Sequence, residues 1–331
     1  MSVNKLQEYQ KLVSWLPKIA ASKNQINKPF ESDCEILKIS DSQYLTLTVD
    51  SVDEEILSKL ITDPETLGWI CIVASCSDLA ASCSNPLGIL LCSSWGMKWN
   101  DHEKKLFGKG VVECLEAHNI SLLGGDTGSS YLSVFSSTGV GLCSNPKTRM
   151  GSKQGDLIVL SSSLKYGARI ALEFIEEERL SKEIESSYRP IAPIQTSLKI
   201  SHLINAAMDT SDGLFRTIDT LCELSNLNCT LNLSAEFYSE ETRTLFKKYS
   251  KPIELASFFE VAEYSVVYSI SKENWPKAKE LVPDLKIIGE FQGSETSSTF
   301  NRKIFRDILD SEPGNYRKKM EFLIDAYKRK T

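Results

Sequence analysis

Predicted strands and helices alternate on both sides of a turn at Ser144-Asn145-Pro146. In the first half, residues 44–49 alternate in the manner of a β-strand, and residues 67–81 form a helix whose start is marked by a capping side chain and a proline. In the second half, a strand over 206–208 leads into a helix over 214–224. Mixed strands and helices in both halves predict an α+β protein of two domains. We place these domains at residues 1–146 and 147–331.

Composition and charge disfavour some classes of partner and of cellular compartment. The chain has 331 residues and a formal net charge of −6, with its basic residues scattered along the sequence. Nucleic acids and anionic membranes are usually bound by clustered basic residues, so we expect neither as a partner. Nine cysteines without a CxxC spacing favour a reducing compartment over a disulfide framework.

Targeting signals are not expected. Residues 1–21 have the pattern of an amphipathic helix and lack the apolar run of a signal peptide. No uncharged apolar stretch reaches the length of about 18 residues that a membrane span requires. The sequence therefore predicts a cytoplasmic protein.

One acidic residue lies within an almost wholly apolar helix. Asp78 follows the run Cys71-Ile72-Val73-Ala74-Ser75-Cys76-Ser77 and precedes Leu79-Ala80-Ala81. Burying a carboxylate is costly unless a cation or a hydrogen-bond network compensates its charge. Asp78 is therefore a candidate metal ligand, and the alternative is an exposed position near the helix end.

Two loops combine glycine with acidic residues. Residues 121–123 are expected to form a short strand that runs into a turn at Gly124-Gly125-Asp126-Thr127, after a buried strand over 87–92. Asp209-Thr210-Ser211-Asp212-Gly213 follows a strand and opens a helix. Carboxylates, hydroxyls and helix N-terminal amides together suit a divalent metal and phosphate oxygens. Either loop, taken alone, is compatible with an ordinary turn.

The order of these motifs resembles that in thiamine-monophosphate kinase. The wider superfamily contains aminoimidazole ribonucleotide synthetase, selenophosphate synthetase and the hydrogenase-maturation carbamoyl dehydratase. Three segments carry the resemblance in order: Ser77-Asp78-Leu79-Ala80-Ala81, Gly124-Gly125-Asp126-Thr127 and Met208-Asp209-Thr210-Ser211-Asp212-Gly213-Leu214. The resemblance extends over about residues 30–225 and is weak beyond them.

The resemblance implies an ATP-dependent kinase of small molecules that uses Mg²⁺ and forms a homodimer. An N-terminal mixed sheet would pair with its copy, and the C-terminal domain would close over the nucleotide. The implied magnesium ligands are Asp33, Asp50, Asp78, Asp126, Asp209 and Asp212. The implied nucleotide contacts are Gly125, Asp126, Arg149 and Ser211. The implied catalytic residues are Asp126, Arg149 and Asp212. Asp53, Glu263 and Tyr264 would lie on the substrate side.

The sequence departs from the family pattern mainly on the substrate side. Leu57 occupies the position where the family has histidine, and Val261-Ala262 replaces a Gly-Glu pair. These changes predict an altered acceptor and poor activity on thiamine phosphate. Two alternatives stay open: ATP-driven dehydration or cyclisation of an amide or carbonyl substrate, and a non-catalytic ATP-binding homologue.

Overall fold

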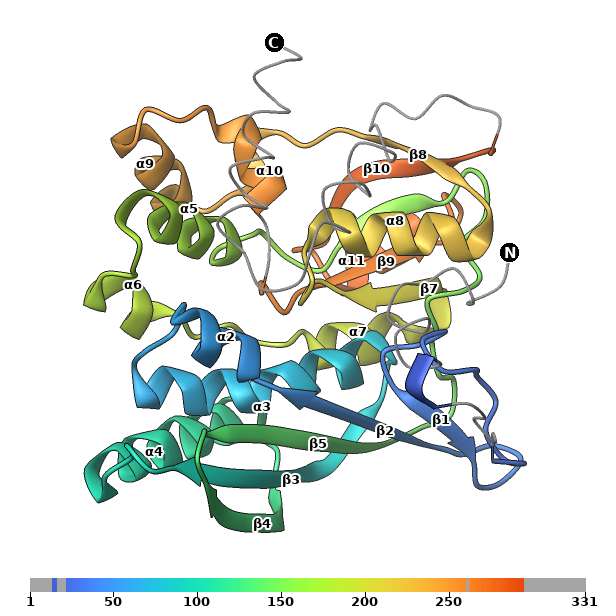
Figure 1. The fold of residues 1–331 in the computed structure, drawn as a ribbon. Helices are drawn as coiled ribbons and strands as arrows, with labels where there is room; N and C mark the ends of the chain where they lie inside the picture. Colours follow the sequence, from blue (N-terminus) through green and yellow to red (C-terminus); the bar gives the residue numbers. More distant parts are fainter. Residues whose placement is uncertain (1–13, 17–21, 260–261, 295–331) are drawn as a thin grey trace.

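Two five-stranded sheets form the framework of the protein (Figure 1). They are seen in a computed structural model that describes residues 14–16, 22–259 and 262–294. The first sheet has the order β1-β2-β5-β3-β4, and the second has the order β7-β9-β6-β10-β8. The sheets thus divide between the two halves of the chain, which confirms the α+β class.

The first half consists of β1 (Glu35–Lys38), β2 (Tyr44–Ser51), α2 (Asp53–Ser58), α3 (Pro64–Ala81), β3 (Asn85–Gly96), α4 (Asp101–His118), β4 (Leu122–Ser130) and β5 (Val134–Cys143). Strands β3 and β4 are parallel, whereas the other neighbours in this sheet are antiparallel. The sheet is therefore mixed, as predicted.

The second half contains β6 (Leu157–Leu160), α5 (Gly167–Glu177), α6 (Lys182–Ser187), α7 (Ile194–Ile200), β7 (Ile204–Asp209), α8 (Leu214–Ser225), β8 (Asn228–Leu231), α9 (Glu240–Lys248), α10 (Ala256–Phe259), β9 (Val266–Ile270), α11 (Trp275–Leu281) and β10 (Lys286–Gln292). Short 3₁₀ turns lie at Ser201–Leu203, Ala235–Phe237 and Ile253–Leu255. All neighbouring strands of this sheet are antiparallel.

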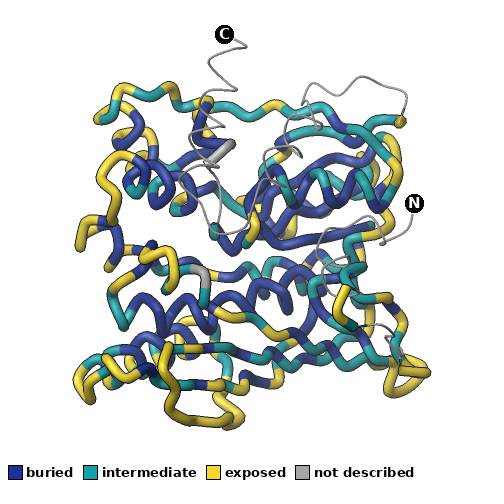
Figure 2. The backbone as a smooth tube through the Cα atoms, viewed as in Figure 1, coloured by how far each residue is buried: buried dark blue, intermediate teal, exposed yellow. Residues whose placement is uncertain are grey.

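Helix α3 lies between the two halves (Figure 1). Its sequence is apolar on every side, and a helix of this kind is stable only when both faces are covered. It packs against α4, β2 and β5 of the first half and against α7 and β7 of the second half. Every residue from Thr66 to Ala81 is buried, as the continuous dark segment in Figure 2 shows. The side chain of Asp63 caps the helix by accepting a hydrogen bond from Thr66 N–H.

Two glycines allow α3 and α4 to approach closely. A Cβ atom at Gly68 would lie 2.1 Å from the carbonyl oxygen of Phe107, and one at Gly110 would lie 1.8 Å from that of Glu65. Neither position has room for a larger residue. The close contact fixes α3 against α4, and so fixes the position of the acidic side chain that α3 carries near its end.

The expected turn at residues 124–127 was wrong. These residues lie within β4, which continues to Ser130 alongside β3. A Cβ atom at Gly125 would come within 1.7 Å of the carbonyl oxygen of Leu91, so glycine here permits close strand pairing instead of a turn. Residues 87–92 do form a strand, but Leu87, Leu90 and Cys92 are exposed and the strand is only half buried.

Among the residues that the structure describes, no helix covers one face of the first sheet, which we call the open face. Helix α3 packs on the other face, where Phe107 of α4 also contacts Trp95 and Phe135. Strand β4, at the sheet edge, is exposed along its whole length (Figure 2). Apolar side chains on the uncovered strands include Val49, Leu90, Leu123 and Val134, which are 69%, 39%, 51% and 40% exposed. The predicted N-terminal helix over 1–21 lies outside the described residues apart from 14–16. None of the described helices is both long and apolar enough to cross a membrane.

Candidate functional site

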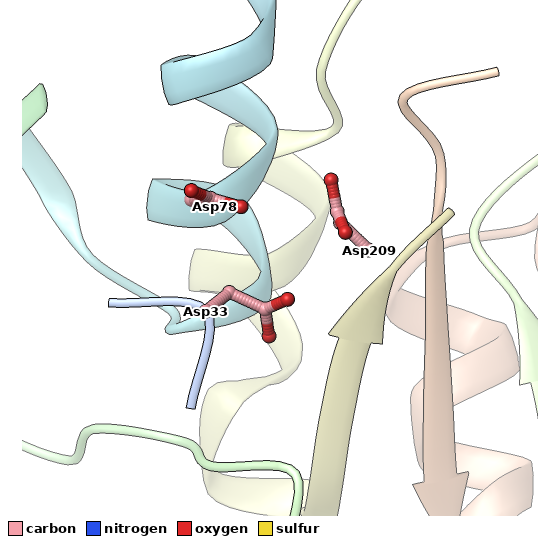
Figure 3. Close-up of side chains that lie close together, drawn as sticks. All are labelled: Asp33, Asp78 and Asp209. Atoms are coloured by element: carbon pink, nitrogen blue, oxygen red, sulfur yellow. The ribbon is translucent and has the colours of Figure 1, made fainter. Parts of the chain in front are cut away.

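Three aspartates from distant parts of the sequence converge between the halves. One carboxylate oxygen from each of Asp33, Asp78 and Asp209 lies within 4.8 Å of the others. Figure 3 shows Asp78 projecting from a helix toward Asp209 at a strand end, with Asp33 on the adjoining segment. The sequence predicted all three as metal ligands, and the fold brings them together.

The position of each acid follows from its element. Asp78 lies in the last turn of the buried helix α3, and Asp209 is the last residue of β7. Asp33 precedes β1 by two residues. Because α3 packs directly against β7, the helix end and the strand end meet at the junction of the two halves.

Arg149 is the nearest cation to this cluster among the described ion pairs. Its Nη2 lies 3.1 Å from Oδ1 of Asp33, and the Asp33 side chain is only 1% exposed. The second oxygen of Asp33, Oδ2, is buried and accepts no hydrogen bond. A buried carboxylate oxygen without a donor is costly, and a bound cation would satisfy it.

The carboxyl groups of Asp78 and Asp50 interact directly within the buried part of the site. Burial raises the pKa of Asp78, and the nearby charges of Asp50 and Asp209 raise it further. Burial also raises the pKa of Asp50, although a hydrogen bond with Asp78 opposes that shift. The hydroxyl of Thr48 donates to Asp78 across α3 and β2. Without a cation, the pKa values of these two carboxyl groups therefore lie above their ordinary range.

Asp209 has two hydroxyl partners. The Ser77 hydroxyl lies 2.6 Å from its Oδ2, and the Ser211 hydroxyl donates to its Oδ1 over 3.0 Å. Burial raises the pKa of Asp209, with the charge of Asp33 acting in the same direction. Asp212 follows on the same loop, is exposed, and raises the pKa of Asp50 through its charge. Asp212 is therefore close enough to Asp50 for its charge to act on the cluster.

Asp126 does not join these acids within one chain. The cross-strand partners in the first sheet lead from Asp50 on β2 to Ser137 on β5. From there they lead to Leu91 on β3 and to Gly125 on β4. Three strand spacings separate Asp50 from Gly125, or about 14 Å. Side chains alternate along a strand, so Asp126 faces the open side of the sheet while Asp50 faces α3.

The three residues expected on the substrate side have different environments. Asp53 is the first residue of α2, and its buried Oδ1 has no hydrogen-bond partner. Glu263 and Tyr264 are 6% and 4% exposed. The Glu263 carboxylate already accepts hydrogen bonds from three backbone amides, those of Lys165, Tyr166 and Gly167. Its contacts are thus those of a structural cap.

Sequence reasoning missed Thr48 and Ser77 as partners of the acids. Both residues belong to segments that the sequence did single out, namely the strand before Asp50 and the apolar helix. The available signal was their spacing: Thr48 shares a strand face with Asp50, and Ser77 is adjacent to Asp78.

The donor set fits a hard divalent cation. Carboxylate oxygens are the ligands that Mg²⁺ prefers, and Mg²⁺ usually combines one or two carboxylates with water and substrate phosphates. Asp33 and Asp209 supply such oxygens, and Asp33 Oδ2 has no other partner. Sulfur and imidazole ligands are absent from the described cluster, which disfavours a zinc site.

Comparisons with known proteins agree with this architecture. Residues 31–143 match the family described as AIR synthase related protein, N-terminal domain. The chain is 27% identical over 291 residues to thiamine-monophosphate kinase of Methanocaldococcus jannaschii, a match that covers 76% of this chain and 88% of that protein. It is 28% identical over 269 residues to the enzyme of the same name from Buchnera aphidicola subsp. Schizaphis graminum, with 77% and 80% covered.

Solved structures show the same fold. The crystal structure of thiamine monophosphate kinase from Aquifex aeolicus superposes with a TM-score of 0.71 at 24% identity, covering 90% of this chain and 97% of that one. A structure of AaThiL complexed with AMPPCP and TMP gives a TM-score of 0.72 at 23% identity, covering 88% and 93%. Hydrogenase maturation protein HypE gives 0.64 at 13% identity, covering 84% and 89%.

The fold that carries the acid cluster thus extends over nearly the full length of the two thiamine-monophosphate kinase structures. Residues 31–143 match the AIR synthase related N-terminal family, and the chain as a whole is similar in sequence to thiamine-monophosphate kinases.

Proposed function

We propose that this protein is an ATP- and Mg²⁺-dependent phosphotransferase that acts on a small-molecule acceptor, in the manner of thiamine-monophosphate kinase. The observation that carries the proposal is the convergence of Asp33, Asp78 and Asp209 beside Arg149, with one Asp33 oxygen left without a donor. The similarity to thiamine-monophosphate kinases over three quarters of the chain supports the same class of reaction.

Asp33, Asp78 and Asp209 would hold Mg²⁺, with Asp50 and Asp212 at the margin of the site. When bound, Mg²⁺ supplies positive charge that neutralises the triphosphate and orients its oxygens. Ser211 and Arg149 would bind the nucleotide. An acceptor that is itself a phosphate is already ionised and needs no general base, so the main task of Arg149 is to offset repulsion between anions.

We further propose that the protein functions as a homodimer. The open sheet face carries exposed apolar side chains on β2, β3 and β5, and the β4 edge presents unpaired backbone groups. A second copy that covers this face would bury both. Asp126 faces that side and Gly125 precedes it on the same edge strand, so dimerisation is the route by which they would reach a nucleotide site.

The acceptor is where this chain is proposed to differ from thiamine-monophosphate kinases. Leu57 is 70% exposed on α2 and offers no charge or hydrogen bond to an incoming phosphate. A missing charge-assisted hydrogen bond typically costs about 1.5–3 kcal/mol, so thiamine phosphate should be a poor acceptor. The proposed setting is the cytoplasm, because none of the nine cysteines, all within the described residues, forms a disulfide, and thiols persist in reducing compartments.

A product analysis tests the proposed function. Protein, ATP and Mg²⁺ are incubated with thiamine phosphate and with other small phosphorylated acceptors, and ADP, inorganic phosphate and phosphorylated product are quantified. A phosphotransferase yields ADP and phosphorylated product in equal amounts. Release of inorganic phosphate together with a dehydrated or cyclised product would contradict the proposal and indicate ATP-driven dehydration or cyclisation instead. For thiamine phosphate, a specificity constant of about 10⁴ M⁻¹s⁻¹ or more would contradict the expected loss of that acceptor.

A further inference from the structure

Glu263 caps a helix that is remote from it in sequence. Its carboxylate accepts hydrogen bonds from the backbone N–H groups of Lys165 and Tyr166 at 2.7 Å and of Gly167 at 2.8 Å. These groups lie at the start of α5, whose N-cap residue, Tyr166, makes no side-chain capping bond. Amides at a helix start lack intrahelical acceptors, and a carboxylate there also interacts favourably with the helix dipole.

The backbone on both sides of Glu263 is strained. Ala262 and Tyr264 have φ angles of 53° and 54°, in the left-handed region that residues with a side chain rarely adopt. Strained conformations persist only where surrounding contacts determine them, and they concentrate at functional sites. The three hydrogen bonds to the Glu263 carboxylate, together with a bond from the Tyr188 hydroxyl to Ala262 O, supply such contacts.

The same strained segment holds the loop that carries Asp209 and Asp212. The Ala262 N–H donates to Ser211 O at 2.8 Å, and the Thr210 N–H donates to Ser265 O at 2.9 Å. The Ser265 N–H returns a bond of 3.1 Å to the Thr210 hydroxyl. Ala262 and Ser265, on either side of Glu263, thus both form hydrogen bonds with the 209–213 loop.

We propose that Glu263 is a positioning residue that fixes the 209–213 loop for metal and nucleotide binding by anchoring the 262–265 segment to the start of α5. Its carboxylate is occupied by backbone amides and does not contact the acceptor. The functional part of this inference rests on the proposed Mg²⁺–ATP site, whereas the structural part concerns only the order of the loop.

Glu185 provides a matched control. It is also 6% exposed and also accepts backbone hydrogen bonds at a helix start, from Thr62 N–H and from Asp63 N–H at 2.7 Å. None of its described hydrogen bonds involves the 209–213 loop. Glutamine at either position replaces one acceptor oxygen by a donor that faces N–H groups, so both variants lose capping bonds of the same kind.

Hydrogen–deuterium exchange of the full chain tests the proposal without nucleotide. Glu263→Gln should raise the exchange rate of the 209–213 amides about tenfold or more, whereas Glu185→Gln should raise exchange at 62–66 and leave 209–213 unchanged. Equal protection of 209–213 in wild type and Glu263→Gln would overturn the proposal. If Glu263→Gln does not fold, the double variant Ala262→Gly with Glu263→Gln relieves the left-handed strain, and the same exchange result is expected from it.

Calorimetric titration of ATP with Mg²⁺ then separates the inference from the function on which it rests. Glu263→Gln should weaken the Kd about tenfold, while Glu185→Gln should keep the wild-type value. An unchanged Kd in Glu263→Gln combined with a raised KM for the acceptor would overturn the positioning role in favour of acceptor contact. If the wild type binds no ATP, the proposed function fails, and the exchange result alone decides whether Glu263 orders the loop.

Discussion

The hydroxyl oxygen of Ser77 lies 2.6 Å from Oδ2 of Asp209, and this contact joins the two halves of the protein at the acid cluster. Ser77 belongs to α3 of the first half, and Asp209 ends β7 of the second half. The hydrogen bond lowers the pKa of Asp209 against the larger effect of burial, which raises it. The acid cluster is therefore assembled only when the halves are docked.

Replacing Ser77 should weaken both the fold and the site. Ser77→Ala removes a donor from a buried carboxylate, which is expected to cost about 1–3 kcal/mol of unfolding free energy. Chemical denaturation measures this loss, and calorimetry measures the affinity for ATP with Mg²⁺. Ser75→Ala is the control, because Ser75 is equally buried on α3 but bonds to Ser137. The account fails here if both variants bind ATP with the same affinity.

The stability of the metal-free protein should fall as pH rises. Burial raises the pKa of Asp209 above its unfolded value of about 3.9, so the folded state holds a proton that the unfolded state releases. This contribution is complete below the unfolded pKa and is lost as pH rises through the folded pKa. Relative to Asp209→Asn, the wild type should therefore lose stability between pH 5 and pH 8.

Thermal unfolding at these two pH values, with and without Mg²⁺, measures the effect of Asp209. Added Mg²⁺ should raise the Tm of the wild type at pH 8 and change that of Asp209→Asn much less. A constant difference in Tm between the two proteins across this pH range would show that the Asp209 proton is not linked to folding.

His118 should give the opposite pH dependence. Its Nδ1 bonds to Cys114 O at 2.7 Å, and its Nε2 accepts from the Ala192 N–H at 2.9 Å, which requires a neutral ring. Burial lowers its pKa, so acid protonates the unfolded state first and stability is lost as pH falls below about 6.5. The stability advantage of wild type over His118→Gln should shrink from pH 7.5 to pH 5, as followed by urea denaturation. An advantage that grows on acidification would contradict this assignment.

Disrupting the open sheet face should produce monomers. Val49→Asp places a charge among apolar side chains that a second copy would cover, and Leu281→Asp changes an apolar residue of α11 that is 40% exposed in the other half. Sedimentation velocity at micromolar concentration should show a dimer for wild type and Leu281→Asp, and a monomer for Val49→Asp. A monomeric wild type would remove the proposed route by which Asp126 reaches a nucleotide site.

Much of the fold could be predicted from local sequence. The strand at Tyr44–Ser51 and the helix at Pro64–Ala81 each follow a clear periodicity or a clear start signal. The sequence did not predict α2, α6 or α9, which are short or strongly polar helices. The stretch at Gly124-Gly125 was mistaken for a turn because the close contact with Leu91 is a tertiary feature.

The candidate site could be predicted in part for a similar reason. Asp33, Asp78 and Asp209 were identified from motif order, and their convergence follows from the packing of α3 against β7. Motif order could not show that Asp126 faces the open side of the sheet, because sheet register determines the face. Nor could it show that the Glu263 carboxylate caps α5, since that contact joins segments about 97 residues apart.

The central claim is that the acids from both halves form one metal-dependent ATP site. Its most direct test is calorimetric titration of ATP into the full-length protein with and without Mg²⁺. The comparison includes wild type, Asp209→Asn and Asp101→Asn, a control whose side chain is 96% exposed on α4. The account predicts binding by wild type and Asp101→Asn only with Mg²⁺, and affinity at least about tenfold lower for Asp209→Asn. Equal ATP affinity in all three proteins, with or without Mg²⁺, would contradict it.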